Sequence, residues 1–302
     1  MARVVSGDRT GALREEASSW AMDYVQRSED LFEPADADEV RIDLVTDPWS
    51  VWCWGLEPVA LAIEHRFPAI TLRPVVGGMF ERLPHHDHPE FNLSRFLARV
   101  QRITGMPVAT AAFGDGGPES TYPACVHAHA MRLLDADRAL LGLRKLRETA
   151  WLDGRDISDV DVATGAARSA GYDPEEFRSA VASGEPEREF RQRLSALERR
   201  ELSAYPTIVV RAGDTTRRLE GFVPLPGLIE VVEQLTGQTH VQAPAPDPAE
   251  VLEPGHRIAT REIAEVCELS IEAAADELAE LEAEDGVERE RHATGDVWTV
   301  QG

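Results

Sequence analysis

Hydrophobic residues gather in two short runs near the start of the chain, with a helical stretch between them. The runs are Val40–Val45 and Ile70–Val76, and the stretch at 59–67 has helical spacing. This strand–helix–strand order predicts two parallel strands joined by a right-handed crossover. Pro74 has no N–H to donate to a neighbouring strand, so we expect it at a sheet edge or near a strand end.

A long block of helical periodicity follows, from about residue 83 to residue 204. Apolar residues recur three and four positions apart in six segments, near 90–102, 122–134, 138–151, 158–170, 174–183 and 185–203. Beyond this block, two strands at 206–210 and 216–220 precede a helix at 225–235. The pattern predicts an α/β fold class over residues 39–238, with a sheet interrupted by a large all-helical insertion.

Three further units are predicted outside this domain. Residues 1–38 are expected to form an N-terminal helical extension, and residues 239–253 a linker rich in proline. Residues 254–302 show two helices, capped by Thr260 and Ser270, followed by a two-stranded hairpin. This order predicts a small winged-helix domain at the end of the chain.

The chain carries a large excess of acidic residues. Its 302 residues include 54 acidic and 31 basic ones, the formal net charge is −23, and Lys145 is the single lysine. Carboxylates at this density hold water and cations in strong salt, which screens their repulsion, so we expect a halophilic protein. The start of the chain lacks the shape of a signal peptide, and no run reaches membrane-spanning length. We therefore expect a cytoplasmic protein with no membrane partner.

The acidity also bears on the C-terminal unit. Residues 254–302 hold thirteen acidic residues and four arginines, and the second helix, 271–283, has no basic residue. A helix that reads DNA needs Arg, Lys, Asn or Gln against bases and phosphates, so nucleic acid is not an expected partner. We expect a module for docking a protein partner or for homodimerisation. Arg289 and Arg291 in the hairpin favour the alternative, a transcription-linked redox sensor.

A turn rich in tryptophan stands between the first strand and its helix. Residues 47–58 read D-P-W-S-V-W-C-W-G-L-E-P, with Trp49, Trp52 and Trp54 around Cys53. The first turn of a helix has unpaired N–H groups and a partial positive charge. This position is therefore expected to stabilise a thiolate or another anion.

The turn resembles the active-site turn of the DsbA-like branch of the thioredoxin superfamily. The FrnE-type oxidoreductases and related protease-adaptor proteins share roughly the pattern D-P-x-C-x-W-C-W-G-x-E-P. The resemblance implies a thioredoxin fold, catalytic positions at Ser50, Cys53 and Pro206, and a cis-proline segment at Tyr205–Pro206 beside the turn. The first cysteine of the pattern is replaced by Ser50. Because a serine hydroxyl is far too weak an acid to attack a disulfide, the dithiol cycle is lost.

Three functional interpretations stay open. In the first, the protein is an adaptor that binds a client protein. The three tryptophans would give apolar contact, and the backbone of Tyr205 would pair with the client. In the second, Cys53 acts as a monothiol, alone or with Cys125 as a redox partner. The segment Y-P-A-C that ends at Cys125 resembles one that faces the active-site turn in the FrnE/adaptor branch. The simpler interpretation of Cys125 is a buried small apolar residue.

The third interpretation is an enzyme that binds a small thiol, similar to kappa-type glutathione transferases or the related chromene-carboxylate isomerase. Ser50 would then hydrogen-bond the bound thiol, although the motif of those enzymes needs a one-residue gap to match this turn. If the chain is an enzyme, the main resemblance implies the thiol–disulfide oxidoreductase type. No cofactor is expected. The cluster His85, His86 and His88 lacks partner ligands, so we expect a solvated loop and no metal site.

Overall fold

The computed structural model describes residues 3–5, 39–84, 92–109, 111, 117–240, 242–253, 256–284 and 286–300. The helix predicted within residues 1–38 and the cluster His85, His86 and His88 lie outside these ranges, so those expectations stay predictions. None of the helices in the described ranges is long and apolar enough to cross a membrane.

The first layer is a five-stranded sheet in the order β1-β5-β4-β2-β3. Its strands are β1 (Arg3–Val5), β2 (Val40–Thr46), β3 (Ile70–Val76), β4 (Thr207–Ala212) and β5 (Thr215–Glu220). β2 and β3 are parallel, with Leu44 opposite Pro74, and the other pairs are antiparallel. The strand that contains Pro74 therefore lies at a sheet edge, as its missing N–H predicts.

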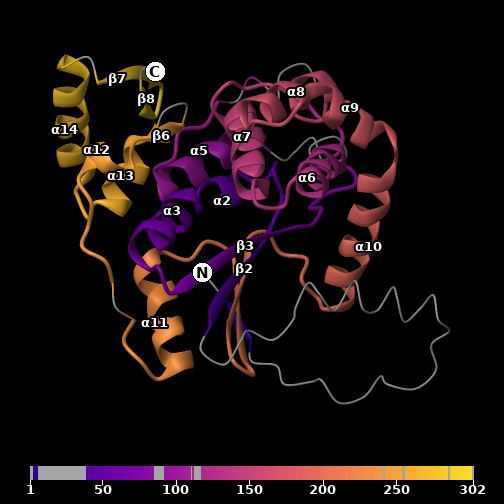
Figure 1. Cartoon of the computed structure of the whole chain (residues 1–302), viewed down its shortest axis with the longest axis horizontal. Coiled ribbons are helices and arrows are strands. Elements are labelled where there is room, and N and C mark those ends of the chain that lie inside the picture. Colours follow the sequence, from indigo (N-terminus) through magenta and orange to yellow (C-terminus); the bar gives the residue numbers. More distant parts are fainter. Residues whose placement is uncertain are drawn as a thin grey trace.

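Helices cover both faces of this sheet. After β2 the chain forms α2 (Val51–Trp54) and α3 (Glu57–Arg66), and after β5 it forms α11 (Leu225–Thr236). α3 and α11 share a buried cluster with one face of the sheet, whereas Val45 and Val209 on the other face pack against α10 (Glu185–Arg199). Figure 1 shows α3 and α11 on one side of the strands and α10 on the other.

The predicted all-helical insertion lies between β3 and β4. It consists of α10 together with α5 (Leu93–Thr104), α6 (Tyr122–Leu134), α7 (Ala139–Trp151), α8 (Val160–Ser169) and α9 (Pro174–Ala182). Asn92, Asp159 and Asp173 accept hydrogen bonds from the first turns of α5, α8 and α9. The helices α5 to α9 gather beyond one end of the sheet, and α10 returns along its side (Figure 1).

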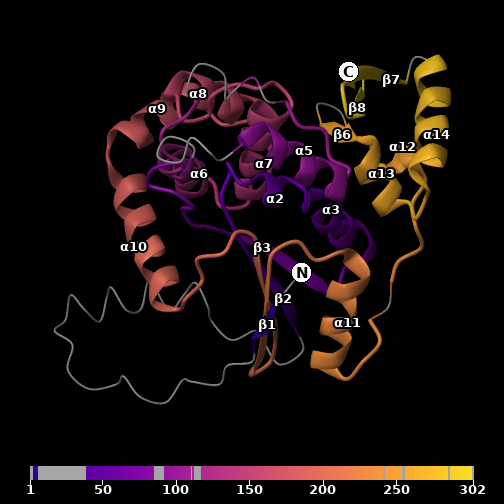
Figure 2. The same ribbon diagram turned by 180° about the vertical axis from the view of Figure 1, so that it is seen from behind.

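The short helix α12 (Pro248–Val251) lies in the predicted linker, and the C-terminal unit after it contains a three-stranded sheet of order β6-β8-β7. The elements of this unit are β6 (Arg257–Ala259), α13 (Thr260–Val266), α14 (Ile271–Ala283), β7 (Val287–His292) and β8 (Gly295–Val300). α13 packs against α3, so buried residues of this unit join the cluster under the main sheet. Figure 2 shows the unit beside α3 and joined to α11 by an extended segment. The domain boundaries and the winged-helix assignment stay predictions.

The helix caps of this unit follow the sequence in one case and depart from it in the other. Ser270 caps α14 as predicted, because its side chain accepts from the backbone N–H of Ala273. The predicted cap Thr260 is instead the first residue of α13, after the N-cap Ala259. The hydroxyl of Thr260 accepts from the Trp298 indole at 2.8 Å, so a buried partner uses it in place of a cap.

Candidate functional site

The predicted turn and the predicted proline segment meet in space. Ser50 is the N-cap of α2, and its side-chain oxygen accepts from the backbone N–H of Cys53 at 3.3 Å. The same hydroxyl lies 3.5 Å from the carbonyl oxygen of Tyr205. The Tyr205–Pro206 peptide bond is cis. The turn and the start of β4, 155 residues apart in sequence, therefore form one site.

A buried carboxylate holds the turn in shape. Asp47 is fully buried, and its two oxygens accept from the backbone N–H groups of Trp49 and Met79, each at 2.7 Å. Burial raises the pKa of Asp47, although these hydrogen bonds oppose that shift. The carboxylate thus ties the turn after β2 to the segment after β3.

Glycine lets the Tyr205 ring reach this place. The backbone N–H of Gly78 donates to the Tyr205 hydroxyl at 3.0 Å. A Cβ atom on Gly77 would lie 2.4 Å from the same hydroxyl oxygen. The Gly77–Gly78 pair therefore marks a close contact with the proline segment as well as the end of β3.

Cys53 is a buried thiol at this site. Its exposed fraction is 3%, and burial raises its pKa above the ordinary value, although Arg147 and the hydroxyls of Ser50 and Thr46 oppose this. The expectation that the first helical turn would favour a thiolate is therefore incomplete, because desolvation outweighs the favourable groups. Cys53 is predominantly a thiol at neutral pH.

Cys125 lies close to the same buried carboxylate. It is fully buried in the first turn of α6, and burial together with the charge of Asp47 raises its pKa well above the ordinary value. Cys53, Cys125 and Cys267 are free thiols in the structure. The pairing of Cys53 with Cys125 stays a prediction.

The three tryptophans of the motif occupy different environments. Trp49 is buried, donates to the Ser158 hydroxyl at 3.1 Å and meets Trp151 edge to face. Trp52 is partly exposed. Trp54 is fully buried and donates to the Pro107 carbonyl at 2.8 Å. Only the first two line the cavity beside the turn, because Trp54 points into the protein interior.

An apolar cavity of about 270 Å³ opens beside the turn. Ser50 lies on its wall with side chains from the motif, from the segment after β3 and from α5, among them Trp49, Trp52, Met79, Phe80, Leu83 and Phe96. Sequence reasoning missed the last four. The available signal was the apolar pair that follows Gly77–Gly78, since that glycine pair ends β3 at the turn.

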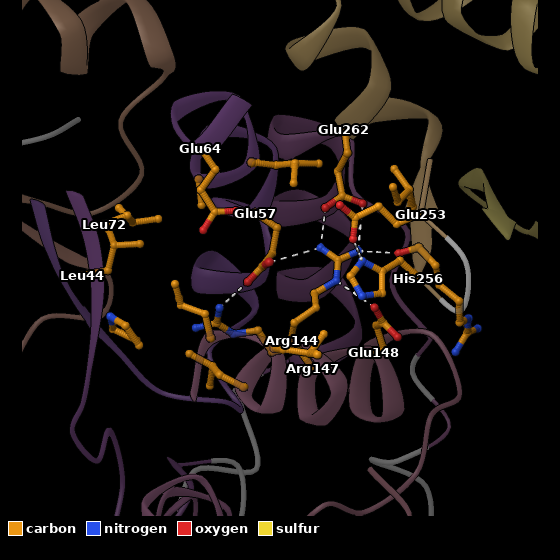
Figure 3. A pocket seen from close by; sticks show the side chains of 18 of the residues that line it. Leu44, Glu57, Glu64, Leu72, Arg144, Arg147, Glu148, Glu253, His256 and Glu262 are labelled. Carbon is orange, nitrogen blue, oxygen red and sulfur yellow. Dashed lines mark hydrogen bonds and ion pairs between the residues drawn. The ribbon is translucent and has the colours of Figure 1, made fainter. Parts of the chain in front are cut away.

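A second cavity, of about 370 Å³, lies between α3, α7 and the C-terminal unit (Figure 3). Its charged wall centres on Arg144 of α7, which contacts Glu57, Glu148 and Glu262. Arg147 pairs with Glu57 from the other side. Burial alone would raise the pKa of Glu57, but Arg147 and Arg144 together lower it. Sequence reasoning noted Glu57 only as a letter of the motif and missed its arginine partners.

Glu64 at this cavity predicts a pH-dependent stability. Burial, then the charges of Glu57 and Glu253, raise its pKa to about 7 from an ordinary value of 4.5. A carboxyl with a raised folded-state pKa contributes stability below pH 4.5, and that contribution is lost as the pH rises through 7. Since Glu64 is more than a third exposed, solvent screening limits the effect to about 1 kcal/mol.

The Glu64→Gln variant is therefore expected to be more stable than the native chain at pH 8 and equally stable near pH 4.5. Urea unfolding at both pH values measures the difference. Glu198→Gln, on exposed α10 surface, is the matched control and should show no such dependence. A gap between Glu64→Gln and the native chain that does not change with pH would contradict the account.

Comparison with known proteins agrees with this geometry. The sequence model of the family described as thioredoxin matches residues 44–222, which include the turn, the insertion and the proline segment. A solved structure from Nitrosomonas europaea, assigned as a protein disulfide isomerase, superposes with a TM-score of 0.57 at 20% identity. It covers 65% of this chain and 97% of its own. The fold over that part is therefore shared.

The chain is also similar to curated relatives over most of its length. The ClpXP adapter protein SpxH of Shouchella clausii is 24% identical over 259 residues, covering 83% of this chain and 85% of the relative. The ClpXP adapter protein SpxH of Bacillus subtilis is 22% identical over 248 residues, covering 80% of this chain and 83% of the relative. The family match covers more than half of the sequence and shows that the chain belongs to the thioredoxin family.

Proposed function

We propose that this protein is a client-binding adaptor that holds a segment of another protein at the Ser50–Cys53 turn without dithiol chemistry. The observation that carries the proposal is the apolar cavity beside the turn, with Ser50 on its wall where the family pattern has a cysteine. An apolar side chain of a client that enters the cavity would contribute about 1.5–3 kcal/mol by burial. Partly buried Trp52 and Phe80 give the cavity two aromatic walls, a composition typical of binding hot spots.

The burial of Cys53 and the hydrogen bonds of Ser50 favour client binding over thiol chemistry. Cys53 is buried and its pKa is raised, so little thiolate is present at neutral pH. The Ser50 hydroxyl faces the Tyr205 carbonyl and accepts from Cys53 N–H. To hold a small bound thiol, as a kappa-type transferase would, Ser50 would have to give up the contact with Tyr205. The adaptor interpretation requires no such exchange.

The adaptor proposal extends to the partner. The curated relatives are named as adapters of the ClpXP protease, and we carry over to this chain the role of bringing a client protein to a protease. The acidic unit at residues 254–302 offers a second surface, for the protease or for a second copy of the chain. A single chain would then contact a client at the turn and another partner at its C-terminal unit.

Protein half-lives in the host test this proposal. In a strain that lacks the gene, a small set of proteins should turn over more slowly, and the native chain should restore their turnover. Cys53→Ala should restore it as well, because binding does not use the thiol. Trp52→Glu should restore less than about a tenth of it, because a charge in an apolar cavity is strongly disfavoured.

The outcomes separate the functional classes. Failure of Cys53→Ala to restore turnover would assign the activity to the thiol and overturn the binding proposal. Full restoration by Trp52→Glu would show that the cavity is not where the client binds. Unchanged half-lives throughout the proteome in the deletion strain would exclude the adaptor role itself.

A further inference from the structure

A chain of alternating charges connects the C-terminal unit to the active-site turn. It starts at Glu262 in the first turn of α13, which is fully buried and accepts from the backbone N–H of Ala259 at 2.7 Å. Both oxygens of Glu262 contact the guanidinium of Arg144, one of them at 2.9 Å. Arg144 also donates to the backbone carbonyl of Arg257 at 2.7 Å, so α7 holds the C-terminal unit at two places.

The series of ion pairs continues from Arg144 to the active-site turn. Arg144 lies 3.1 Å from one oxygen of Glu57, and the other oxygen of Glu57 pairs with Arg147. Arg147 is buried and also donates to the hydroxyl of Thr46, the last residue of β2. Figure 3 shows Glu57 between the two arginines, with Glu262 on the far side of Arg144.

Arg147 is linked to Cys53 through Thr46, whose hydroxyl accepts from Arg147 and contacts the Cys53 thiol. Among the influences that favour the Cys53 thiolate, the charge of Arg147 is the largest. Other titratable groups at the Cys53 thiol are Cys125 on α6, Tyr205 before β4, and Asp47, whose backbone hydrogen-bonds the thiol. Glu57 compensates part of the Arg147 charge, so the hold of Glu57 on Arg147 governs how much positive charge Cys53 experiences.

Because two arginines compete for Glu57, the two ends of this series of ion pairs, Glu262 and Arg147, depend on each other. Glu57 is shared between Arg144 and Arg147, and Arg144 is shared between Glu57, Glu148 and Glu262. If Glu262 is withdrawn, Arg144 turns more fully to Glu57. Glu57 then holds Arg147 less closely, which leaves more uncompensated positive charge beside Cys53. Ion pairs buried at this depth are weakly screened, so the rearrangement is transmitted.

We propose that Glu262 is a positioning residue for the active-site turn: through Arg144 and Glu57 it sets the position and compensation of Arg147 beside Cys53. A partner that lifts the C-terminal unit from α3 therefore changes the turn, and a ligand at the turn changes how firmly the unit is docked. The inference does not depend on the adaptor function, because Cys53 serves here only as a reporter of its surroundings.

The pH profile of Cys53 modification tests the inference in the full chain. Each variant is treated with iodoacetamide across a pH series, and mass spectrometry of peptides follows Cys53 and Cys125 separately. Rates are normalised to their plateau at high pH, which removes differences in access. Glu262→Gln is expected to lower the midpoint for Cys53, with about threefold more thiolate at a fixed pH below it. The profile of Cys125 is expected to keep its midpoint.

A control on the same helix separates the charge chain from a general loss of negative charge. Glu265 lies one turn along α13 and pairs with Arg261, which is not part of the series of ion pairs from Glu262 to Arg147. Glu265→Gln removes the same charge and is expected to leave the Cys53 midpoint unchanged. Arg144→Gln is expected to raise the midpoint, because Glu57 then compensates Arg147 more fully. These opposite signs for Glu262 and Arg144 distinguish a charge chain from a structural clamp, which would shift both variants in the same direction.

The melting temperature verifies that each variant is folded at the temperature of the assay. If Glu262→Gln does not fold, Glu262→Asp keeps the charge but shortens the side chain, and a smaller shift in the same downward direction is expected. An unchanged or raised Cys53 midpoint in a folded Glu262 variant overturns the inference. So does an equal shift in Glu265→Gln.

Discussion

Replacing Arg144 by methionine is expected to lower the free energy of unfolding by about 3–5 kcal/mol, the range for a buried ion pair that loses one partner. The side chain contacts three carboxylates, of which Glu262 is fully buried and Glu148 and Glu57 are 5% and 14% exposed. Lys145 and Arg147 can compensate Glu148 and Glu57, whereas Glu262 is held by Arg144 and by one backbone N–H. Denaturant unfolding by circular dichroism measures the loss.

Arg178→Met is the matched control for Arg144→Met. Arg178 makes an ion pair with Asp161 in which the two side chains are 41% and 74% exposed. Exposed pairs of this kind contribute about 0–1 kcal/mol. Similar losses in the two variants would mean that the carboxylates around Arg144 are solvated in the native protein.

Ser50→Cys is expected to confer dithiol–disulfide activity on the chain. The new thiol would stand at the N-cap of α2, three residues before Cys53, where the helix N-terminus and the first-turn N–H groups lower a thiol pKa. Insulin reduction with dithiothreitol is expected to rise from background to at least about tenfold above it. The native chain, with Ser50, is expected to stay at background.

Ser158→Cys is the control for Ser50→Cys. Ser158 contacts the indole of Trp49, which lines the same cavity. The Ser158→Cys variant therefore adds a thiol near the cavity but outside the C-x-x-C spacing. Mass spectrometry of the oxidised proteins should find a 50–53 disulfide in the first variant and no new disulfide in the control. If Ser50→Cys forms the disulfide and still does not reduce insulin, the surroundings of the turn have changed beyond the lost cysteine.

Much of the fold could be predicted because its longer elements carry a clear local signal. The strand Ile70–Val76 and the helix Tyr122–Leu134 have the bounds that the hydrophobic pattern predicts. Ser270 caps its helix as expected, since it precedes a regular apolar repeat. In these places local propensity and tertiary packing favour the same structure.

The elements missed were short or were specified by partners far away in sequence. β6 has three residues and pairs with β8, while α12 has four residues inside a segment rich in proline. Neither is long enough to show periodicity. Their formation depends on packing within the C-terminal unit.

The candidate site was predictable as a location but not as an environment. The structure places Ser50 in contact with Cys53 and Tyr205, as the resemblance implied, because the fold sets the turn beside the start of β4. The interior position of Trp54 could not be read from its neighbours in sequence, since its environment comes from Pro107 and from Arg144, which lies 4.8 Å over its ring. The pairing of Glu57 with arginines 87 and 90 residues later could not be read from its sequence neighbours either.

Site-specific photo-crosslinking tests most directly whether a client occupies the cavity. A benzophenone amino acid replaces Phe80 on the cavity wall in one variant and Leu133, exposed on α6, in the other. The account predicts that position 80 crosslinks a defined protein in living cells, that position 133 does not, and that adding Trp52→Glu removes the product. Crosslinks of equal yield from both positions, or a product from position 80 that Trp52→Glu leaves intact, would contradict it.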